Sequence, residues 1–278
     1  MRQYKSGKDI FITEYSSIGE FVASINSLPT NQYFKDRDLS SQTKENDDNG
    51  WYRSCDYHRA TYLLTHGWDS AAEKMASKVK LTKGIGSPAR TSKPVYGVVG
   101  SQASVPRYLQ GIPTNMISRQ TTYSKQKVIT ITKGISYAGR CSSEFIMKES
   151  IKALELIQSL ETSGQRVRLN VMVAATTSGK STLCKVCVKQ PDERLNISKM
   201  AFALAHPSML RRFFFFLMET DPFVEFDVGY GYGTPSALYI KEKALAENEY
   251  YIPEEITNMD ELIKQLQSGA KPKSKATP

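Results

Sequence analysis

The amino-acid sequence predicts an α/β protein with a smaller helical N-terminal portion. Residues 166–188 consist of two runs in which apolar and polar residues alternate, joined by Ser178-Gly179. Two such runs around a short Ser-Gly turn are typical of an antiparallel β-hairpin. The preceding stretch, "CSSEFIMKESIKALELIQSLETSG", has apolar residues at helical spacing. A strand-like run, "QKVITITK", stands before that helix, and this alternation of elements indicates the α/β class.

We expect residues 1–83 to form the mainly helical N-terminal portion. The segment opens with a short strand, "DIFITEY", after which Ser17 and Glu20 form a capping box in front of a short helix. Further on, "CDYHRATYLLTHGW" has a helical apolar stripe that ends at Gly67, a residue favoured at helix C-termini.

Residues 84–124 are rich in Gly, Pro and Ser. Such a composition does not favour long regular elements, and the length of the segment predicts an extended arm that crosses the domain. Two pieces of it, "YGVVG" and "VPRYLQG", are apolar enough to pack against the rest of the protein.

Residues 125–267 are the most regular part of the chain. After the hairpin, "RLNISKMAFALAHPSMLRR" reads as helical, and "RFFFFLMET" is a continuous apolar run typical of a central strand covered on both faces. "NEYYIPEEITNMDELIKQLQ" predicts a strand and a last helix, and the polar, basic residues 268–278 are expected to be disordered. The expected central strands are Val128–Thr132, Val167–Val173 and Phe213–Leu217.

The letters "SGKS" at residues 178–181 also end a nucleotide-binding P-loop. A working P-loop needs a glycine five positions before Gly179, where this chain has Ala174, and a helix after Lys180. The residues that follow, "STLCKVCVKQ", have a strand-like pattern instead. The hairpin turn is therefore favoured, and a nucleotide-using enzyme is the weaker alternative.

Composition narrows the class of protein further. No apolar run approaches the ~18 residues that span a bilayer, and "MRQYKSGKDIF" lacks the apolar region of a signal peptide. We therefore expect a protein without a membrane partner that stays in the cytoplasm. The four cysteines are too few for a disulfide scaffold. Cys184 and Cys187 resemble half a zinc knuckle without a second half nearby, so we expect no metal. We also expect no cofactor and no catalytic residues.

The distribution of charge is uneven. The net charge is +9, and no Asp or Glu occurs from Lys74 through Ser143. One interpretation is a solvated surface balanced by acids elsewhere, and the other is a face that attracts phosphates. On the second interpretation, the expected nucleic-acid-binding residues are Lys83, Arg90, Lys93, Arg107 and Arg119.

The order of the elements in residues 125–267 resembles the von Willebrand factor A (vWA) domain. The resemblance is carried mainly by "VITITKGISYAGRCSSEFIMKESIKALELIQSLETSGQRVRLNVMVA", where a first strand, a first helix and "LE…G.RVRL" have vWA-like spacing. It implies a mainly parallel sheet in which the hairpin supplies an antiparallel edge. The whole chain, with "LLTHGW", "SVPRYLQGIPTNM" and "HPSMLRRFFFF", also resembles uncharacterised proteins of tailed bacteriophages.

The sequence departs from the vWA pattern at the metal site. A metal-binding vWA domain carries Asp-x-Ser-x-Ser after its first strand, because a divalent cation needs several oxygen ligands. The matching residues, Thr130 to Ser136, include no Asp, and Lys133 would repel a cation. The resemblance therefore implies the scaffold without the metal.

These observations predict a non-enzymatic binding protein, encoded by a phage, that engages nucleic acid or another phosphate-rich partner through its acid-free segment. A virion-assembly or protein-interaction component, in the host cytoplasm or in the virion, is the alternative. The sequence leaves open whether the partner is DNA, RNA or protein, and in which oligomeric state the chain works.

Overall fold

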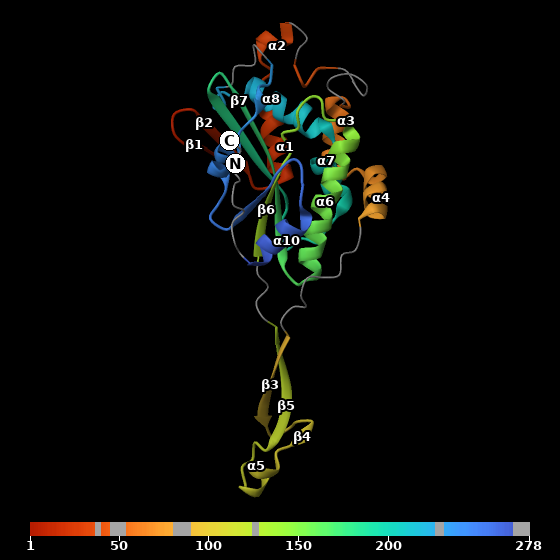
Figure 1. Ribbon diagram of the computed structural model, residues 1–278, viewed down its shortest axis with the longest axis vertical. Helices are drawn as coiled ribbons and strands as arrows, with labels where there is room; N and C mark the ends of the chain where they lie inside the picture. Colours follow the sequence, from red (N-terminus) through yellow and green to blue (C-terminus); the bar gives the residue numbers. More distant parts are fainter. Residues whose placement is uncertain (37–39, 45–53, 80–89, 124–127, 226–230, 269–278) are drawn as a thin grey trace.

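The computed structural model describes residues 1–36, 40–44, 54–79, 90–123, 128–225 and 231–268. They form an α/β body and a hairpin that extends away from it (Figure 1). The body contains all the described residues outside 90–123.

A seven-stranded sheet forms the centre of the body, in the order β1-β2-β8-β7-β6-β10, with β9 paired to β7. Neighbours β10, β6 and β7 are parallel, and β2 is parallel to β8, whereas β7 and β8 are antiparallel. The expected α/β class, with a mostly parallel sheet and an antiparallel hairpin, is confirmed. The strands are β1 (Arg2–Lys5), β2 (Ile10–Tyr15), β6 (Val128–Gly134), β7 (Arg166–Thr177), β8 (Lys180–Lys189), β9 (Thr234–Pro235) and β10 (Glu249–Ile252).

The turn between β7 and β8 is a two-residue hairpin turn. Thr177 pairs with Lys180, and the residues between them, Ser178 and Gly179, have φ values of 47° and 81°. Positive φ at both central residues is the signature of the turn type that matches the twist of paired strands. Because β8 is a strand and not a helix, the P-loop interpretation is wrong.

The position of this hairpin in the sheet differs from expectation. We expected its second strand, β8, at the sheet edge, but β2 pairs with β8 along six residues and β1 forms the edge. The physical reason lies in β2, where Phe11, Ile12 and Thr13 are all buried. A strand buried on both faces belongs inside a covered sheet. The N-terminal residues thus supply strands to the body as well as helices.

The expected central strand at Phe213–Leu217 is wrong. These residues belong to a π-helical segment η1 (Met209–Phe214) and the helix α8 (Phe215–Thr220) that continues it. Every residue from Met209 to Met218 is buried. This helical segment is buried on all sides, and a short apolar run such as its phenylalanines does not distinguish a buried helix from a buried strand.

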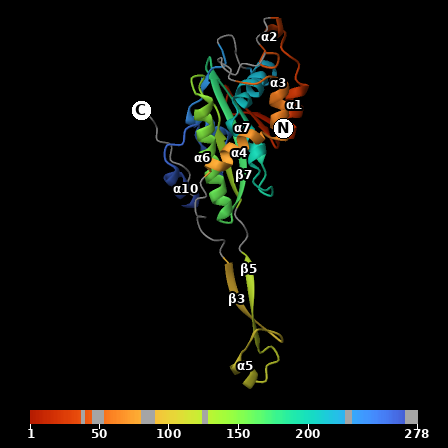
Figure 2. The ribbon, with the colours of Figure 1, turned by 90° about the vertical axis from the view of Figure 1, so that its right-hand side faces the viewer.

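Most of the helices cover one face of the sheet, where the main core lies (Figure 2). Helix α6 packs against α7 and β7, and α7 also contacts α3 and α4. Ser17 caps α1 by accepting a hydrogen bond from the Glu20 amide at 3.1 Å, as the capping box predicts. The helices of the body are α1 (Ile18–Ser27), α2 (Gln32–Asp36), α3 (Tyr57–His66), α4 (Asp69–Lys78), α6 (Ser143–Thr162), α7 (Ile197–Ala205), α8, α9 (Leu238–Lys241) and α10 (Met259–Ser268).

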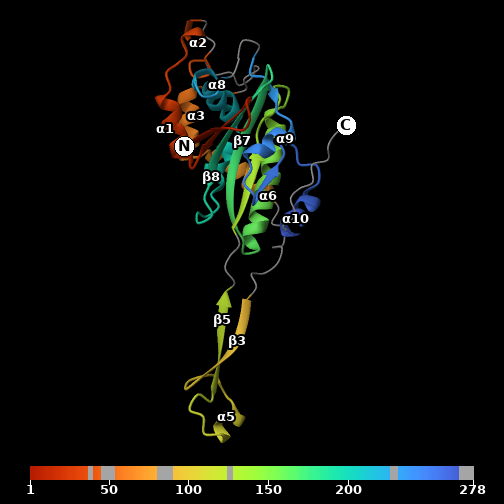
Figure 3. The same ribbon diagram turned by 90° about the vertical axis from the view of Figure 1, so that its left-hand side faces the viewer.

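The opposite face of the sheet has a thinner cover. A smaller core of Ile12, Met172, Leu183 and their neighbours lies beneath α9 and the 3₁₀ turn η2 (Glu242–Ala244) (Figure 3). This cover reaches part of the face, and polar side chains of the strands lie beyond it. The two faces of the sheet therefore have different environments.

Residues 90–123 form a hairpin of their own. It consists of β3 (Arg90–Gly97), β4 (Gln102–Ala103), the short helix α5 (Val105–Leu109) and β5 (Met116–Tyr123), in the sheet order β3-β5-β4. The expected arm across the domain is wrong, because this segment is regular and extends away from the body in all three views (Figures 1–3). Pro94 is compatible with β3 because β3 is an edge strand, where a missing N–H is tolerated.

Candidate binding hairpin and polar cleft

The basic residues of the hairpin do not share one face. In a strand pair, residues opposite each other share a face and successive residues alternate. Lys93 is opposite Gln120, whereas Arg119 is opposite Pro94, so Lys93 and Arg119 are on opposite faces. Of the other predicted residues, Lys83 lies outside the described residues, and only the backbone of Arg90 is described.

Arg107 joins Arg119 on one face. Its guanidinium lies 3.9 Å from the centre of the Tyr96 ring, and its Nη1 donates a 3.0 Å hydrogen bond to the carbonyl oxygen of Thr114. Tyr96 is opposite Ile117, which places it on the same face as Arg119. The structure thus brings together two of the five expected residues and separates a third from them.

The far end of the hairpin is apolar and exposed. Val99 is 81% exposed and Leu109 is 79% exposed, although sequence analysis expected this region to pack. Contiguous exposed apolar residues on a protein surface commonly mark an interaction site. We call these residues the apolar tip: Val98, Val99, Val105, Tyr108 and Leu109.

Lys133 is a buried lysine whose ammonium is bound by backbone oxygens. The Nζ of Lys133, near the end of β6, donates hydrogen bonds to the carbonyl oxygens of Pro253 and Glu254, the latter at 2.9 Å. The side chain is fully buried. Its ammonium thus links β6 to the segment after β10.

The pH dependence of stability tests this buried ammonium. Burial lowers the pKa of Lys133 from 10.5 to about 8, against the attraction of Glu254 and Glu149, while Lys241 and Lys152 lower it further. Between those values the unfolded chain holds a proton that the folded chain has released, so this group favours folding increasingly as pH rises. Relative to Lys133→Met, the wild type should therefore gain about 2 kcal/mol of unfolding free energy from pH 7 to pH 10.

Denaturant titrations at both pH values measure this difference. Lys199→Met is the matched control, because Lys199 is exposed on α7. The difference in free energy of unfolding between Lys199→Met and the wild type should be the same at both pH values. Parallel pH profiles for the wild type and Lys133→Met would contradict the prediction.

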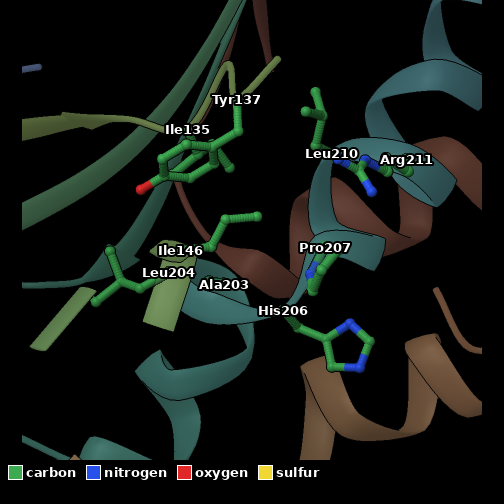
Figure 4. A pocket seen from close by; sticks show the side chains of 9 residues that line it. All are labelled: Ile135, Tyr137, Ile146, Ala203, Leu204, His206, Pro207, Leu210 and Arg211. Atoms are coloured by element: carbon green, nitrogen blue, oxygen red, sulfur yellow. The ribbon is translucent and has the colours of Figure 1, made fainter. Parts of the chain in front are cut away.

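A small cavity lies beside the segment that follows β6. Figure 4 shows Tyr137 and Ile146 on one side of it, with Pro207 and Leu210 on the other. Its volume is about 10 Å³, which is room for one water molecule at most. This cavity is therefore too small for a substrate or cofactor.

The opposite face of the sheet carries a row of polar side chains that sequence analysis missed. The Nζ of Lys185 on β8 lies 2.7 Å from Glu14 Oε1 on β2 and 3.0 Å from Glu249 Oε2 on β10. Asn170 on β7 donates to Glu249 Oε1 at 2.9 Å, and the hydroxyl of Thr132 on β6 donates to the same oxygen. Five neighbouring strands thus contribute one connected network.

The charges in this network are compensated. Burial alone would raise the pKa of Glu249, but Lys185, the Ala246 amide and Thr132 together lower it, so the carboxylate remains ionised. The third acceptor of Lys185 is the carbonyl oxygen of Ala244 at 2.7 Å. In the sequence, the only sign of this network was that Lys185 and Glu249 lie within strand-like runs. That the two residues pair depends on the register of strands that are far apart in the chain.

A cleft of about 570 Å³ opens above this row. Its walls come from β1 and β2 on one side and from residues 244–246 on the other, and β6, β7 and β8 form its floor. We call it the polar cleft. Its volume lies within the range of small-molecule sites in proteins.

The remaining candidate chemistry is sparse. The thiol of Cys184 is buried in the main core, and that of Cys187 donates to the carbonyl oxygen of Lys189 at 3.4 Å. In the described part of the chain, no group of three or more His, Cys, Asp or Glu side chains is arranged to hold a metal ion. No helix within the described ranges combines the length and apolar character that crossing a bilayer requires.

Comparisons with known proteins give one result. No curated protein and no solved structure matches the chain, so the likenesses to vWA domains and to phage proteins stay predictions. A family model described as a domain of unknown function, DUF7192, matches residues 3–269 and thus includes both the body and the hairpin. The chain therefore belongs to the DUF7192 family.

Proposed function

We propose that the protein is a non-enzymatic assembly component that docks onto a partner protein through its projecting hairpin. The observation that carries this proposal is the apolar tip, held away from the body at the end of a regular hairpin. Aliphatic side chains that are mostly exposed lower solubility unless a partner covers them. Tyr and Arg, which are enriched in the centres of protein interfaces, are both present as Tyr96, Arg107 and Tyr108.

The charge of the hairpin specifies the chemistry of the partner. Residues 90–123 include four basic residues and no Asp or Glu. Lys93 and Arg119 project from opposite faces, so positive charge lies on both sides of the ribbon. Such an element fits an apolar groove bordered by carboxylates on both sides, because charge complementarity speeds association and fixes orientation. A virion-assembly role is the form of this proposal that the resemblance to tailed-phage proteins supports.

Site-specific photo-crosslinking tests the docking. A benzophenone amino acid replaces Val99 in the tip or, as the matched control, Tyr239, which is 67% exposed on the body. In cells that produce the protein in its native context, the residue-99 probe should give a discrete protein adduct that the residue-239 probe does not. Lys93→Glu combined with Arg119→Glu should reduce the yield of that adduct by at least fivefold.

Three outcomes would contradict the proposal. They are equal adduct patterns from the two positions, no protein adduct from residue 99, and an adduct that the double charge reversal leaves unchanged. Mass spectrometry of the adduct distinguishes a different protein from a second copy of this chain.

Nucleic-acid binding is the second candidate, and the absence of acids from residues 90–123 favours it. Each lysine or arginine that contacts a phosphate of duplex DNA contributes ~0.9 to the slope of log affinity against log salt. Arg107 and Arg119 share a face, so Arg119→Gln should reduce this slope by about one. Mobility shifts with DNA and RNA at two salt concentrations measure it, and an unchanged slope would count against this candidate.

A further inference from the structure

The polar cleft has an excess of positive charge. Its lining includes the basic residues Arg2, Arg168 and Lys185 and the acidic residues Glu14 and Glu249. Both carboxylates are bound to Lys185, at 2.7 Å and 3.0 Å. Lys185 carries one positive charge against these two carboxylates, so the three basic and two acidic side chains of the cleft leave a net charge of +1.

Neither arginine is paired with an acid of the described chain. Arg2, on β1, is exposed, and its guanidinium lies 4.7 Å from the centre of the Tyr4 ring. Arg168, on β7, is partly buried and lies beside Cys187; burial raises the pKa of that thiol, and the charge of Arg168 and its hydrogen bond with Cys187 oppose this effect. The Nε of Arg168 is buried, and no described side chain or backbone group accepts a hydrogen bond from it.

The surroundings of these guanidinium groups strengthen their attraction for anions. Asn170 and Glu249 on the floor are nearly fully buried, so the base of the cleft is formed by side chains that water hardly reaches. Charge interactions are stronger where water is excluded. Arginine presents several N–H donors in a planar fork that matches the oxygens of a phosphate or carboxylate.

We infer that the polar cleft binds a small molecule that carries a phosphate or carboxylate group, held between Arg2 and Arg168. The volume of about 570 Å³ admits a ligand the size of a mononucleotide as well as a simpler anion. This site is on the body and is independent of the hairpin, so its test does not depend on the proposed docking function.

Calorimetry with the full chain, at constant ionic strength, tests the inference. The probes are pyrophosphate, citrate and AMP, with uncharged adenosine for comparison. At least one anion should bind with micromolar affinity, and Arg168→Gln or Arg2→Gln should each weaken it tenfold or more. Binding of pyrophosphate and AMP but not citrate assigns a phosphate group, and binding of citrate alone assigns a carboxylate.

Arg59→Gln is the matched control, because Arg59 is exposed on α3, away from the cleft. Its affinity for the anion should stay within twofold of the wild-type value. Should Arg168→Gln unfold the chain, Arg2→Gln carries the test, since its exposed side chain contributes little to stability. The inference is overturned if no anion binds, if adenosine binds as tightly as AMP, or if Arg59→Gln weakens binding as much as the cleft variants.

Discussion

Replacing Lys185 by Met should lower the free energy of unfolding by ~3–5 kcal/mol, because it leaves the buried carboxylate of Glu249 without its counterion. Lys185 lies within 3.0 Å of both Glu14 and Glu249 oxygens, and the Glu249 side chain is only 2% exposed. Chemical denaturation at pH 8 measures the loss. A loss below ~1 kcal/mol would show that the network contributes little to stability.

The control is on the same strand. Lys180 pairs with Glu225 at 3.3 Å, but both side chains are more than 40% exposed. Lys180→Met should change stability by no more than ~0.5 kcal/mol, because solvent screens an exposed ion pair. The two substitutions remove the same group, so their difference isolates the effect of burial.

Acid should reduce the effect of Lys185→Met. In the wild type the pKa of Glu249 is lowered, so its stabilising contribution is present above the ordinary pKa of a glutamate and is lost as pH falls. Without Lys185, burial raises the pKa of Glu249, and protonation of the carboxylate relieves the penalty. The stability gap between variant and wild type should therefore narrow from pH 8 to pH 5. The double variant Lys185→Met/Glu249→Gln should recover part of the loss at pH 8.

Phe213→Ala should destabilise the body by ~3–5 kcal/mol, because it leaves a cavity among aromatic side chains. The Phe213 ring lies 6.0 Å from that of Phe21, 5.3 Å from that of Tyr57 and 6.1 Å from that of Phe202, in edge-to-face arrangements. It thus joins η1 to α1, α3 and α7. Thermal or denaturant unfolding measures the loss.

Tyr239→Ala is the comparison for Phe213→Ala, since it also removes an aromatic ring, from a residue that is 67% exposed on α9. It should change stability by no more than ~0.5 kcal/mol. Similar losses for both substitutions would show that Phe213 does not hold the helices together.

Local sequence patterns correctly predicted the elements whose conformation depends on neighbouring residues alone. The β7–β8 hairpin follows from two alternating runs and from Ser178-Gly179, both in the left-handed conformation. The phenylalanine run was misassigned, because a short apolar run fits a buried helix as well as a buried strand. Arg211 and Arg212 just before it are also buried, and the carbonyl oxygens of Ser41, Lys44 and Cys55 accept hydrogen bonds from Arg212.

The polar cleft could not be predicted from local sequence patterns. Glu14, Lys185 and Glu249 are far apart in the sequence and meet only because β2 pairs with β8 and β10 pairs with β6. A shift of one residue in either register would turn these side chains to the other face. The acid-free composition of the hairpin could be read from the sequence, whereas its exposure and the separation of Lys93 from Arg119 required the strand pairing.

The pairing of β2 with β8 has a consequence for how the chain folds during synthesis. Ile10 pairs with Ser181, about 170 residues later. At the usual rates of translation, that partner leaves the ribosome roughly 10–30 s after β2 does. One edge of the apolar strand "IFIT" can pair with β1 at once, but the edge that faces β8 has to wait for that time, and contacts between such distant residues form slowly. The β8-facing edge of β2 should therefore stay open to other contacts until β8 has been made.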